Sequence, residues 1–282
     1  MTPATGPQVP AETARPRDHL LDVPGATLYG QARGNGPALV LLGGGPSNAD
    51  TLAPLAGQLA RDYTVITYDR RGYSRSRQDD SGEQVGIPGH GRDLIALIAR
   101  LGAAPAALFG TSFGALVALE GAASDPDLIG TLIVHEPPLG ELLADGQRKP
   151  FDLDLDAQPD AGSALNAIAA SIGVTRGAAA GPGPGRGSGP RPADVETFIR
   201  RDAPAIGAYH LDLARLRALR DRTVVTGSED GRAFYPYQCA LRLAQALGTP
   251  LVELPGNHAG MIQDPAPFAA RLRALLNSPA AR

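Results

Sequence analysis

Short apolar runs alternate along most of this chain with longer segments in which apolar residues recur every three or four positions. Runs of this kind are typical of strands buried in a sheet, and the wider spacing is typical of helices with one buried face. We expect strands at residues 37–42, 63–68, 106–110, 129–134, 223–226 and 251–254, with helices at residues 50–61, 91–101, 233–247 and 265–276 and directly after residue 112. Strands that alternate with helices through short loops predict a mostly parallel sheet with helices on both faces.

The N-terminal part has a different pattern. Residues 1–17 are rich in proline, threonine and alanine without periodicity, so we expect a disordered tail. Residues 19–23 and 26–33 are strand candidates separated by Pro24-Gly25, a turn signal, and predict a hairpin. With this hairpin the sheet is expected to have eight strands in an α/β fold.

The alternation stops between residues 137 and 220. This region holds helical fragments at 164–172, 195–203 and 211–219 but no clear buried strand. A run of glycine and proline at residues 181–192 excludes regular structure and predicts a flexible loop. We therefore expect a core domain made of residues 18–136 and 221–278, interrupted by a small helical insertion at 137–220.

Composition narrows the possible partners. The 282-residue chain has a net charge of -3, which offers no electrostatic basis for binding nucleic acid or an anionic membrane, so a small-molecule partner is expected. Cys239 is the only cysteine, which excludes an intrachain disulfide and a cysteine-rich metal site. The first residues do not resemble a signal peptide, and no apolar run reaches the roughly 18 residues of a membrane span. A cytoplasmic location is the default expectation.

One motif carries candidate chemistry. Residues 110–114 read Gly-Thr-Ser-Phe-Gly, between a predicted strand and a predicted helix. A serine on such a turn sits in a strained conformation at the end of a strand, and the two glycines let strand and helix pass closely. Ser112 is therefore a candidate nucleophile.

A serine nucleophile needs a base and an acid that orients the base. Asp230 and His258 each follow a later predicted strand, at the edge of the sheet where Ser112 is expected. We predict a triad of these three residues. Two other acids compete with Asp230 for its role: Glu229 is adjacent to it, and Glu136 follows an earlier strand.

Over residues 20–276 the chain resembles the α/β hydrolases. The glycine-rich loop at 43–46 is similar to the family's oxyanion loop, and residues 69–76 (Asp-Arg-Arg-Gly-Tyr-Ser-Arg-Ser) to its Asp-x-Arg-Gly-x-Gly-x-Ser loop. The insertion falls where the family carries its cap, and the order Ser112, Asp230, His258 is the family's order. Two departures are Gly43, where histidine is usual, and Ser74, where glycine is usual.

The resemblance implies a serine hydrolase that cleaves an ester, thioester, lactone or related acyl bond, without a metal or an organic cofactor. It implies an oxyanion hole formed by the N–H groups of Gly45 and Phe113. Because cap and loop residues line the family's pockets, further substrate-binding candidates are Tyr209, Phe234, Tyr235 and Met261.

Other interpretations have less support from the sequence. Asp152, Asp154 and Asp156 resemble the start of a calcium loop but lack its glycine and its glutamate. The glycines at 43–45 imitate a dinucleotide-binding fingerprint without its third glycine. The main alternative is an α/β-hydrolase scaffold with a non-hydrolytic role, such as acyl transfer, perhydrolysis, a tailoring step or ligand binding.

Overall fold

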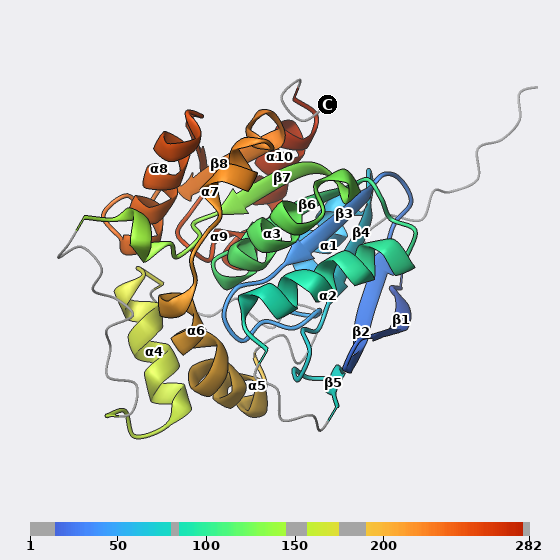
Figure 1. The fold of residues 1–282 in the computed structure, drawn as a ribbon, viewed down its shortest axis with the longest axis horizontal. Helices are drawn as coiled ribbons and strands as arrows, with labels where there is room; N and C mark the ends of the chain where they lie inside the picture. Colours follow the sequence, from blue (N-terminus) through green and yellow to red (C-terminus); the bar gives the residue numbers. More distant parts are fainter. Residues whose placement is uncertain (1–14, 80–84, 145–156, 175–189, 279–282) are drawn as a thin grey trace, which may run out of the picture.

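The computed structural model describes residues 15–79, 85–144, 157–174 and 190–278 (Figure 1). The three aspartates at 152–156 and most of the predicted flexible loop at 181–192 lie outside these ranges. Arg17, assigned to the disordered tail by the sequence, instead begins the first strand and pairs with Ala32. None of the described helices is both long enough and apolar enough to cross a membrane.

A twisted, mostly parallel sheet forms the centre of the molecule (Figure 1). Its strands run in the order β1-β2-β4-β3-β6-β7-β8-β9, and these eight are the predicted ones. A short ninth strand among the described residues, β5, pairs with β2 and was not predicted. The bounds are β1 Arg17–Val23, β2 Ala26–Arg33, β3 Ala38–Leu42, β4 Thr64–Tyr68, β5 Arg77–Gln78, β6 Ala106–Thr111, β7 Ile129–His135, β8 Thr223–Ser228 and β9 Leu251–Leu254.

Strands β1 and β2 form the predicted antiparallel hairpin, with Val23 opposite Ala26. Gly25 in the turn has φ +74°, a conformation that glycine adopts without steric cost. From β4 to β9 the neighbouring strands are parallel, so their carboxyl ends meet at one edge of the sheet. This edge is where the candidate catalytic residues lie.

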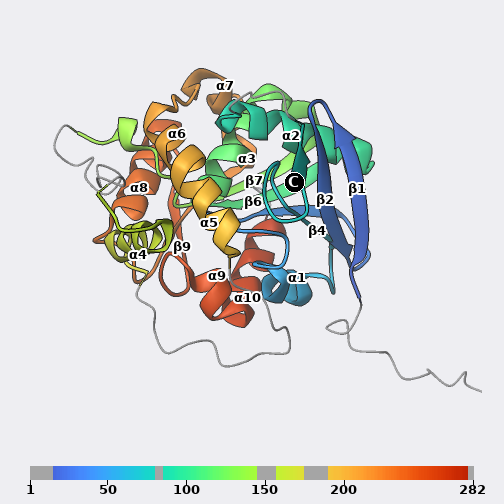
Figure 2. The same ribbon diagram turned by 90° about the horizontal axis from the view of Figure 1, so that it is seen from below.

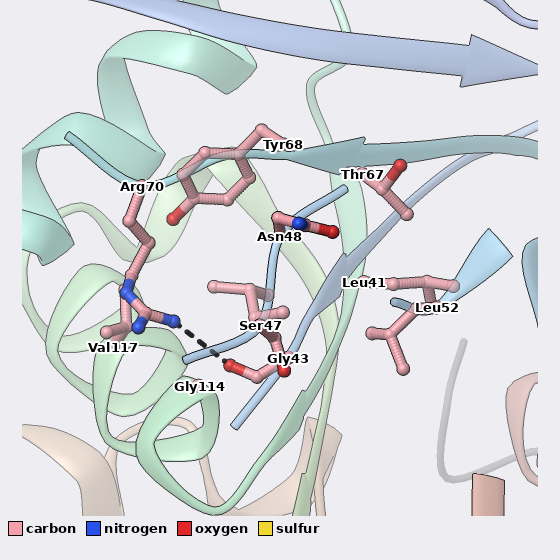
Figure 3. A pocket seen from close by; sticks show the side chains of 11 residues that line it. Leu41, Gly43, Ser47, Asn48, Leu52, Thr67, Tyr68, Arg70, Gly114 and Val117 are labelled. Carbon is pink, nitrogen blue, oxygen red and sulfur yellow. Dashed lines mark hydrogen bonds between the residues drawn. The ribbon is translucent and has the colours of Figure 1, made fainter. Parts of the chain in front are cut away.

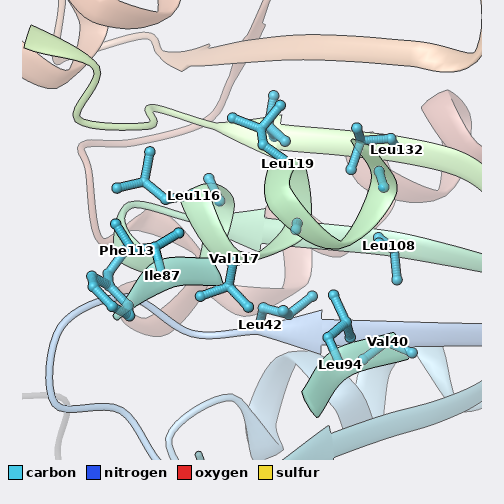
Figure 4. Packing of buried hydrophobic residues seen from close by; sticks show 14 of the residues in the cluster. Val40, Leu42, Ile87, Leu94, Leu108, Phe113, Leu116, Val117, Leu119 and Leu132 are labelled. Atoms are coloured by element: carbon cyan, nitrogen blue, oxygen red, sulfur yellow. The ribbon is translucent and has the colours of Figure 1, made fainter. Parts of the chain in front are cut away.

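Helices cover both faces of the sheet, as the alternation predicted (Figure 2). One face packs against α2, α3 and α8, and the other against α1, α9 and α10. The bounds are α1 Ala53–Leu59, α2 Ile87–Arg100, α3 Phe113–Ser124, α8 Tyr235–Leu247, α9 Gly260–Gln263 and α10 Pro265–Leu276, with short 3-10 turns at Pro126–Leu128, Gly140–Leu142 and Arg220–Arg222. Apart from Glu120 and Ser124, the helix α3 is apolar on all its faces, and it is enclosed by the sheet and its neighbouring helices (Figure 4).

Most of the helices inserted between β7 and β8 gather at the carboxyl edge of the sheet (Figure 1). We call them the cap: α4 Ala161–Ser171, α5 Pro192–Thr197, a π-helix at Phe198–Asp202 and α6 Ala203–Ala208. The last inserted helix, α7 Leu213–Arg217, instead packs against α3 and α8. The middle helix is longer than the predicted 195–203 because Pro192 begins it, at a position where proline is favoured. Its π-helical turn lies just before Pro204, which has no N–H to donate to the helix.

Candidate active site

Ser112 sits on a sharp turn between β6 and α3. Its φ is +52° and its ψ is -122°, a strained conformation for a residue with a side chain. The Ser112 N–H donates to the His135 carbonyl at 2.9 Å, and the Ser112 carbonyl accepts from Ala115 at 2.9 Å. The turn is thereby held on one side by the neighbouring strand and on the other by the first turn of its own helix.

The glycines around Ser112 are required by close backbone approach. A Cβ at Gly110 would lie 2.6 Å from the Gly114 carbonyl oxygen, and a Cβ at Gly114 would lie 2.3 Å from the Leu42 carbonyl oxygen. Real Cβ atoms do not approach backbone this closely, so any larger residue would push strand and helix apart. The structure therefore confirms that these two glycines let strand and helix pass closely.

His258 lies in the loop after β9 and is paired with Glu136, which directly follows β7. Nδ1 of His258 is 2.5 Å from Oε2 of Glu136. The second oxygen of Glu136, Oε1, accepts from the Ser228 backbone N–H at 2.8 Å and from the Ser228 hydroxyl at 2.6 Å. A carboxylate accepts only, so Nδ1 of His258 carries the proton and Nε2 is left as the basic atom of the ring.

Ionisation of Glu136 is favoured although its carboxylate is almost fully buried. Burial by itself opposes the charge, but the hydrogen bonds from His258 and Ser228 lower the pKa of Glu136 to about 2. The side chain therefore stays negative at neutral pH and can stabilise a positive charge on the His258 ring.

Asp230 does not orient His258, contrary to the prediction. Its side chain is exposed, and its backbone N–H donates to the Gly256 carbonyl at 3.0 Å. Glu229, the adjacent alternative, is also exposed. β8 extends two residues further than predicted, to Ser228, so the following turn carries both acids to the surface, and the hydroxyl of Ser228 contacts Glu136 instead.

His135 was assigned no role from the sequence, yet it lies against the His258 ring. The two ring centroids are 6.3 Å apart with nearly parallel planes, and Nε2 of His135 is 4.0 Å from Oε2 of Glu136. Nδ1 of His135 is 3.0 Å from the Thr226 hydroxyl, which itself donates to the Val134 carbonyl. Because the Thr226 hydrogen is already used, His135 donates from Nδ1, and complete burial lowers its pKa to about 4.

The loop at residues 43–46, which we call the glycine loop, lies beside Ser112. A Cβ at Gly44 would be 2.8 Å from Cβ of Ser112. Gly45 has φ +43°, and the Phe113 N–H is at the first position of α3, where helical N–H groups have no partner within the helix. Within the described residues neither of these N–H groups donates a hydrogen bond, so both are available to a ligand.

Of the four predicted pocket residues, two lie in contacts that hold the fold. The Tyr209 hydroxyl donates to Glu120 on α3 at 3.0 Å, and Met261 is buried in the core against α10. Phe234 and Tyr235 are half-buried and face the cap: Phe234 lies against Gly173 after α4, and Tyr235 lies against Gly140. That these four residues line the substrate pocket stays a prediction.

The structure brings Ser112, Glu136 and His258 to the carboxyl ends of β6, β7 and β9. Among the described residues no hydrogen bond joins the Ser112 hydroxyl to His258, a contact that is often long in ligand-free enzymes. Sequence reasoning named Glu136 only as a competitor. The signal that made it a candidate is its place directly after a predicted strand, and Asp230 has the same signal.

Comparisons with known proteins agree with this architecture. Residues 39–271 match the model of the alpha/beta hydrolase family. "Uncharacterized hydrolase YraK" of Bacillus subtilis is 31% identical over 261 residues, covering 91% of this chain and 94% of that protein. The 2-(acetamidomethylene)succinate hydrolase of Mesorhizobium japonicum is 30% identical over 120 residues, covering 41% of this chain and 42% of that protein.

A solved structure extends the likeness to three dimensions. The alpha/beta hydrolase from Sphaerobacter thermophilus superposes with a TM-score of 0.72 at 28% identity, covering 93% of this chain and all of that one. Together with the family model and the relative from Bacillus subtilis, this likeness shows that the chain belongs to the alpha/beta hydrolase family.

Proposed function

We propose that this hydrolase cleaves an acyl bond of a small molecule, such as an ester, thioester or lactone, through a Ser112–His258–Glu136 triad. The observation that carries the proposal is the 2.5 Å pairing of His258 with Glu136 at the edge of the sheet where the strained Ser112 turn lies. It replaces the predicted acid, Asp230, by Glu136.

The reaction follows from the roles of these groups. The Ser112 hydroxyl attacks the substrate carbonyl while Nε2 of His258 takes its proton, and Glu136 stabilises the charged ring. The N–H groups of Gly45 and Phe113 receive the negative charge that develops on the carbonyl oxygen. His258 then gives the proton to the leaving group. In the second half of the reaction the same nitrogen takes a proton from water, which attacks the acyl carbon, and the proton passes to the Ser112 oxygen as the acid leaves.

A fluorophosphonate probe and a panel of chromogenic esters of increasing acyl length test the nucleophile. Wild type should be labelled and should hydrolyse at least one ester, whereas Ser112→Ala should do neither. A folded wild type that is not labelled, or equal labelling of Ser112→Ala, refutes the proposal.

A matched pair of substitutions tests the acid. Glu136→Gln places an amide against Nδ1 of His258 and favours the wrong ring tautomer, so kcat should fall by about 10³- to 10⁴-fold. Asp230→Asn is the same chemical change at an exposed carboxylate and should leave kcat within about twofold of wild type. A larger loss in Asp230→Asn than in Glu136→Gln would restore Asp230 as the acid.

The alternative is a non-hydrolytic reaction on the same scaffold, including acyl transfer and perhydrolysis. An acyl group on Ser112 can pass to water, to an alcohol or to peroxide, and the triad geometry is common to all three acceptors. Product analysis with competing acceptors separates them, since a hydrolase yields mainly the free acid when an alcohol is added.

A further inference from the structure

A buried polar cluster joins the cap to the core beside the glycine loop. It consists of Arg70 and Tyr73 from the loop after β4, His90 from α2, and Asp202 from the π-helix of the cap. All four side chains are almost completely buried, although they include an arginine and a carboxylate. Burial of these charges is costly unless each has partners, so their contacts indicate what the cluster does.

Arg70 holds two carbonyl groups of the glycine loop. Its Nη1 donates to the Gly43 carbonyl at 3.3 Å (Figure 3), and its Nη2 donates to the Gly45 carbonyl at 2.5 Å. The guanidinium also lies 4.3 Å from the ring centroid of Tyr73 and 4.8 Å from that of Phe113. Arg70 therefore contacts both segments whose N–H groups are proposed to bind the oxyanion.

Asp202 supplies the negative charge opposite Arg70. Its Oδ2 accepts from the Tyr73 hydroxyl at 2.6 Å and lies 3.5 Å from Nη2 of Arg70, while Oδ1 lies 3.5 Å from Nε2 of His90. Burial lowers the pKa of His90, so this ring is neutral at pH 7. Oδ1 of Asp202 also accepts from Nε of Arg201 at 3.2 Å, so two guanidinium groups face this carboxylate, and it is Arg70 whose hydrogen bonds reach the glycine loop.

The inner side of the glycine loop faces a small cavity, and Ser47 holds only the middle carbonyl of the loop, that of Gly44, through its N–H and its hydroxyl. A cavity of about 10 Å³, the room of one water molecule, lies between the loop and β4 and is lined by Gly43, Ser47, Tyr68 and Arg70, among others (Figure 3). The histidine usual at position 43 in related enzymes has no room here, because a Cβ on Gly43 would lie 2.5 Å from Cβ of Ser47. The Arg70 hydrogen bonds are thus the side-chain contacts that hold the Gly43 and Gly45 carbonyls.

The cap lies directly over the same loop. The Phe198 ring, which opens the π-helix that ends at Asp202, lies 3.9 Å from where a Cβ of Gly45 would be and packs edge-to-face on Phe113. A π-helical turn widens a helix locally and is frequent at functional sites. This turn places Phe198 over the loop and Asp202 beside Arg70.

We propose that Asp202 is a positioning residue for the oxyanion hole: docking of the cap brings its carboxylate to Arg70, which holds the glycine loop so that the Gly45 N–H faces the reacting carbonyl. The inference rests on the proposed function, because it assigns Asp202 and Arg70 to the oxyanion hole of that reaction. It makes the cap a part of the catalytic geometry as well as a cover for the substrate.

Another cap-to-core contact supplies a matched control. The Tyr209 hydroxyl donates to Glu120 at 3.0 Å, just as the Tyr73 hydroxyl donates to Asp202. Glu120 lies eight residues after Ser112 on α3, about 12 Å further along the helix, and contacts no residue of the glycine loop. Asp202→Asn and Glu120→Gln therefore make the same change at two cap contacts, of which only one reaches Arg70.

The experiment compares these two variants with wild type by steady-state kinetics on the best ester. Asp202→Asn should lower kcat by about 10- to 100-fold with KM changed by less than about twofold, because a displaced oxyanion donor affects the transition state more than substrate binding. Glu120→Gln should keep both constants near those of wild type. Arg70→Lys should resemble Asp202→Asn, since an ammonium cannot reach both carbonyls, and the double variant should lose little more than either single one.

Hydrogen exchange of the peptide that contains residues 43–47 gives a readout that needs no activity. It should speed up in Asp202→Asn and stay unchanged in Glu120→Gln, with thermal unfolding confirming that both variants are folded.

The inference is refuted if Asp202→Asn keeps wild-type kcat and exchange, if Glu120→Gln loses as much kcat as Asp202→Asn, or if the Arg70 and Asp202 effects on kcat add fully. If wild type has no acyl-hydrolase activity, the proposed function fails, and the role assigned to Asp202 in the oxyanion hole falls with it. Exchange confined to Asp202→Asn would then show only that Asp202 holds the loop.

Discussion

Replacement of His135 by phenylalanine should change how the stability of this protein depends on pH. His135 is fully buried between the His258 ring and the rings of Phe109 and Phe268, and only its Nδ1 has a hydrogen-bond partner. His135→Phe keeps an aromatic ring in this space and removes the titratable group. At neutral pH the variant should have a lower free energy of unfolding than wild type, because the N–H that donates to the Thr226 hydroxyl is lost.

The size of the pH effect follows from the pKa of His135. Burial lowers this pKa from 6.5 to about 4, although the nearby Glu136 carboxylate opposes the shift. Between these two values the unfolded chain binds a proton that the folded protein does not, so stability falls as the pH falls. Integrated from pH 7 to pH 4, the loss due to His135 is about 3 kcal/mol.

Urea unfolding of wild type and His135→Phe at several pH values between 7 and 4 measures this loss. The free energy of unfolding of wild type should fall more steeply than that of the variant, and the difference between the two falls should be about 3 kcal/mol. Groups that do not contact His135 titrate in both proteins and cancel in the comparison. Parallel curves would show that His135 is protonated in the folded protein near its ordinary pKa and would refute the reasoning.

Two further predictions concern packing around the site. Gly114→Ala should destabilise the protein by about 2 kcal/mol or more, because the added methyl group would meet the Leu42 and Gly43 carbonyl oxygens. An unchanged urea midpoint would contradict the packing described for the turn at Ser112. Burial raises the pKa of Cys239 to about 12, so its thiol should resist a disulfide reagent in the native protein at about pH 8 and react once the chain is unfolded. Equal reaction rates in the folded and the unfolded protein would contradict its burial.

The sequence by itself determined the sheet and the place of the nucleophile. Both depend on local patterns: apolar runs specify buried strands, and two glycines around a serine specify a tight strand-to-helix turn. The predicted strands and the elbow at Ser112 are therefore found within a residue or two of where they were expected. Helix starts were less accurate, as at α2, which begins at Ile87, four residues before the predicted start.

Only the tertiary structure decided which acid faces His258. Glu136 and Asp230 both follow strands at the same edge, and the sequence pattern around them does not separate the two. The choice depends on the direction of each side chain beyond its strand: Glu136 has φ +49° and turns inward to Ser228, whereas Asp230 lies on a turn that faces solvent. The pairing of Arg70 with Asp202 likewise joins residues far apart in the chain. Local periodicity carries no information on such contacts, because they arise when separate elements pack together.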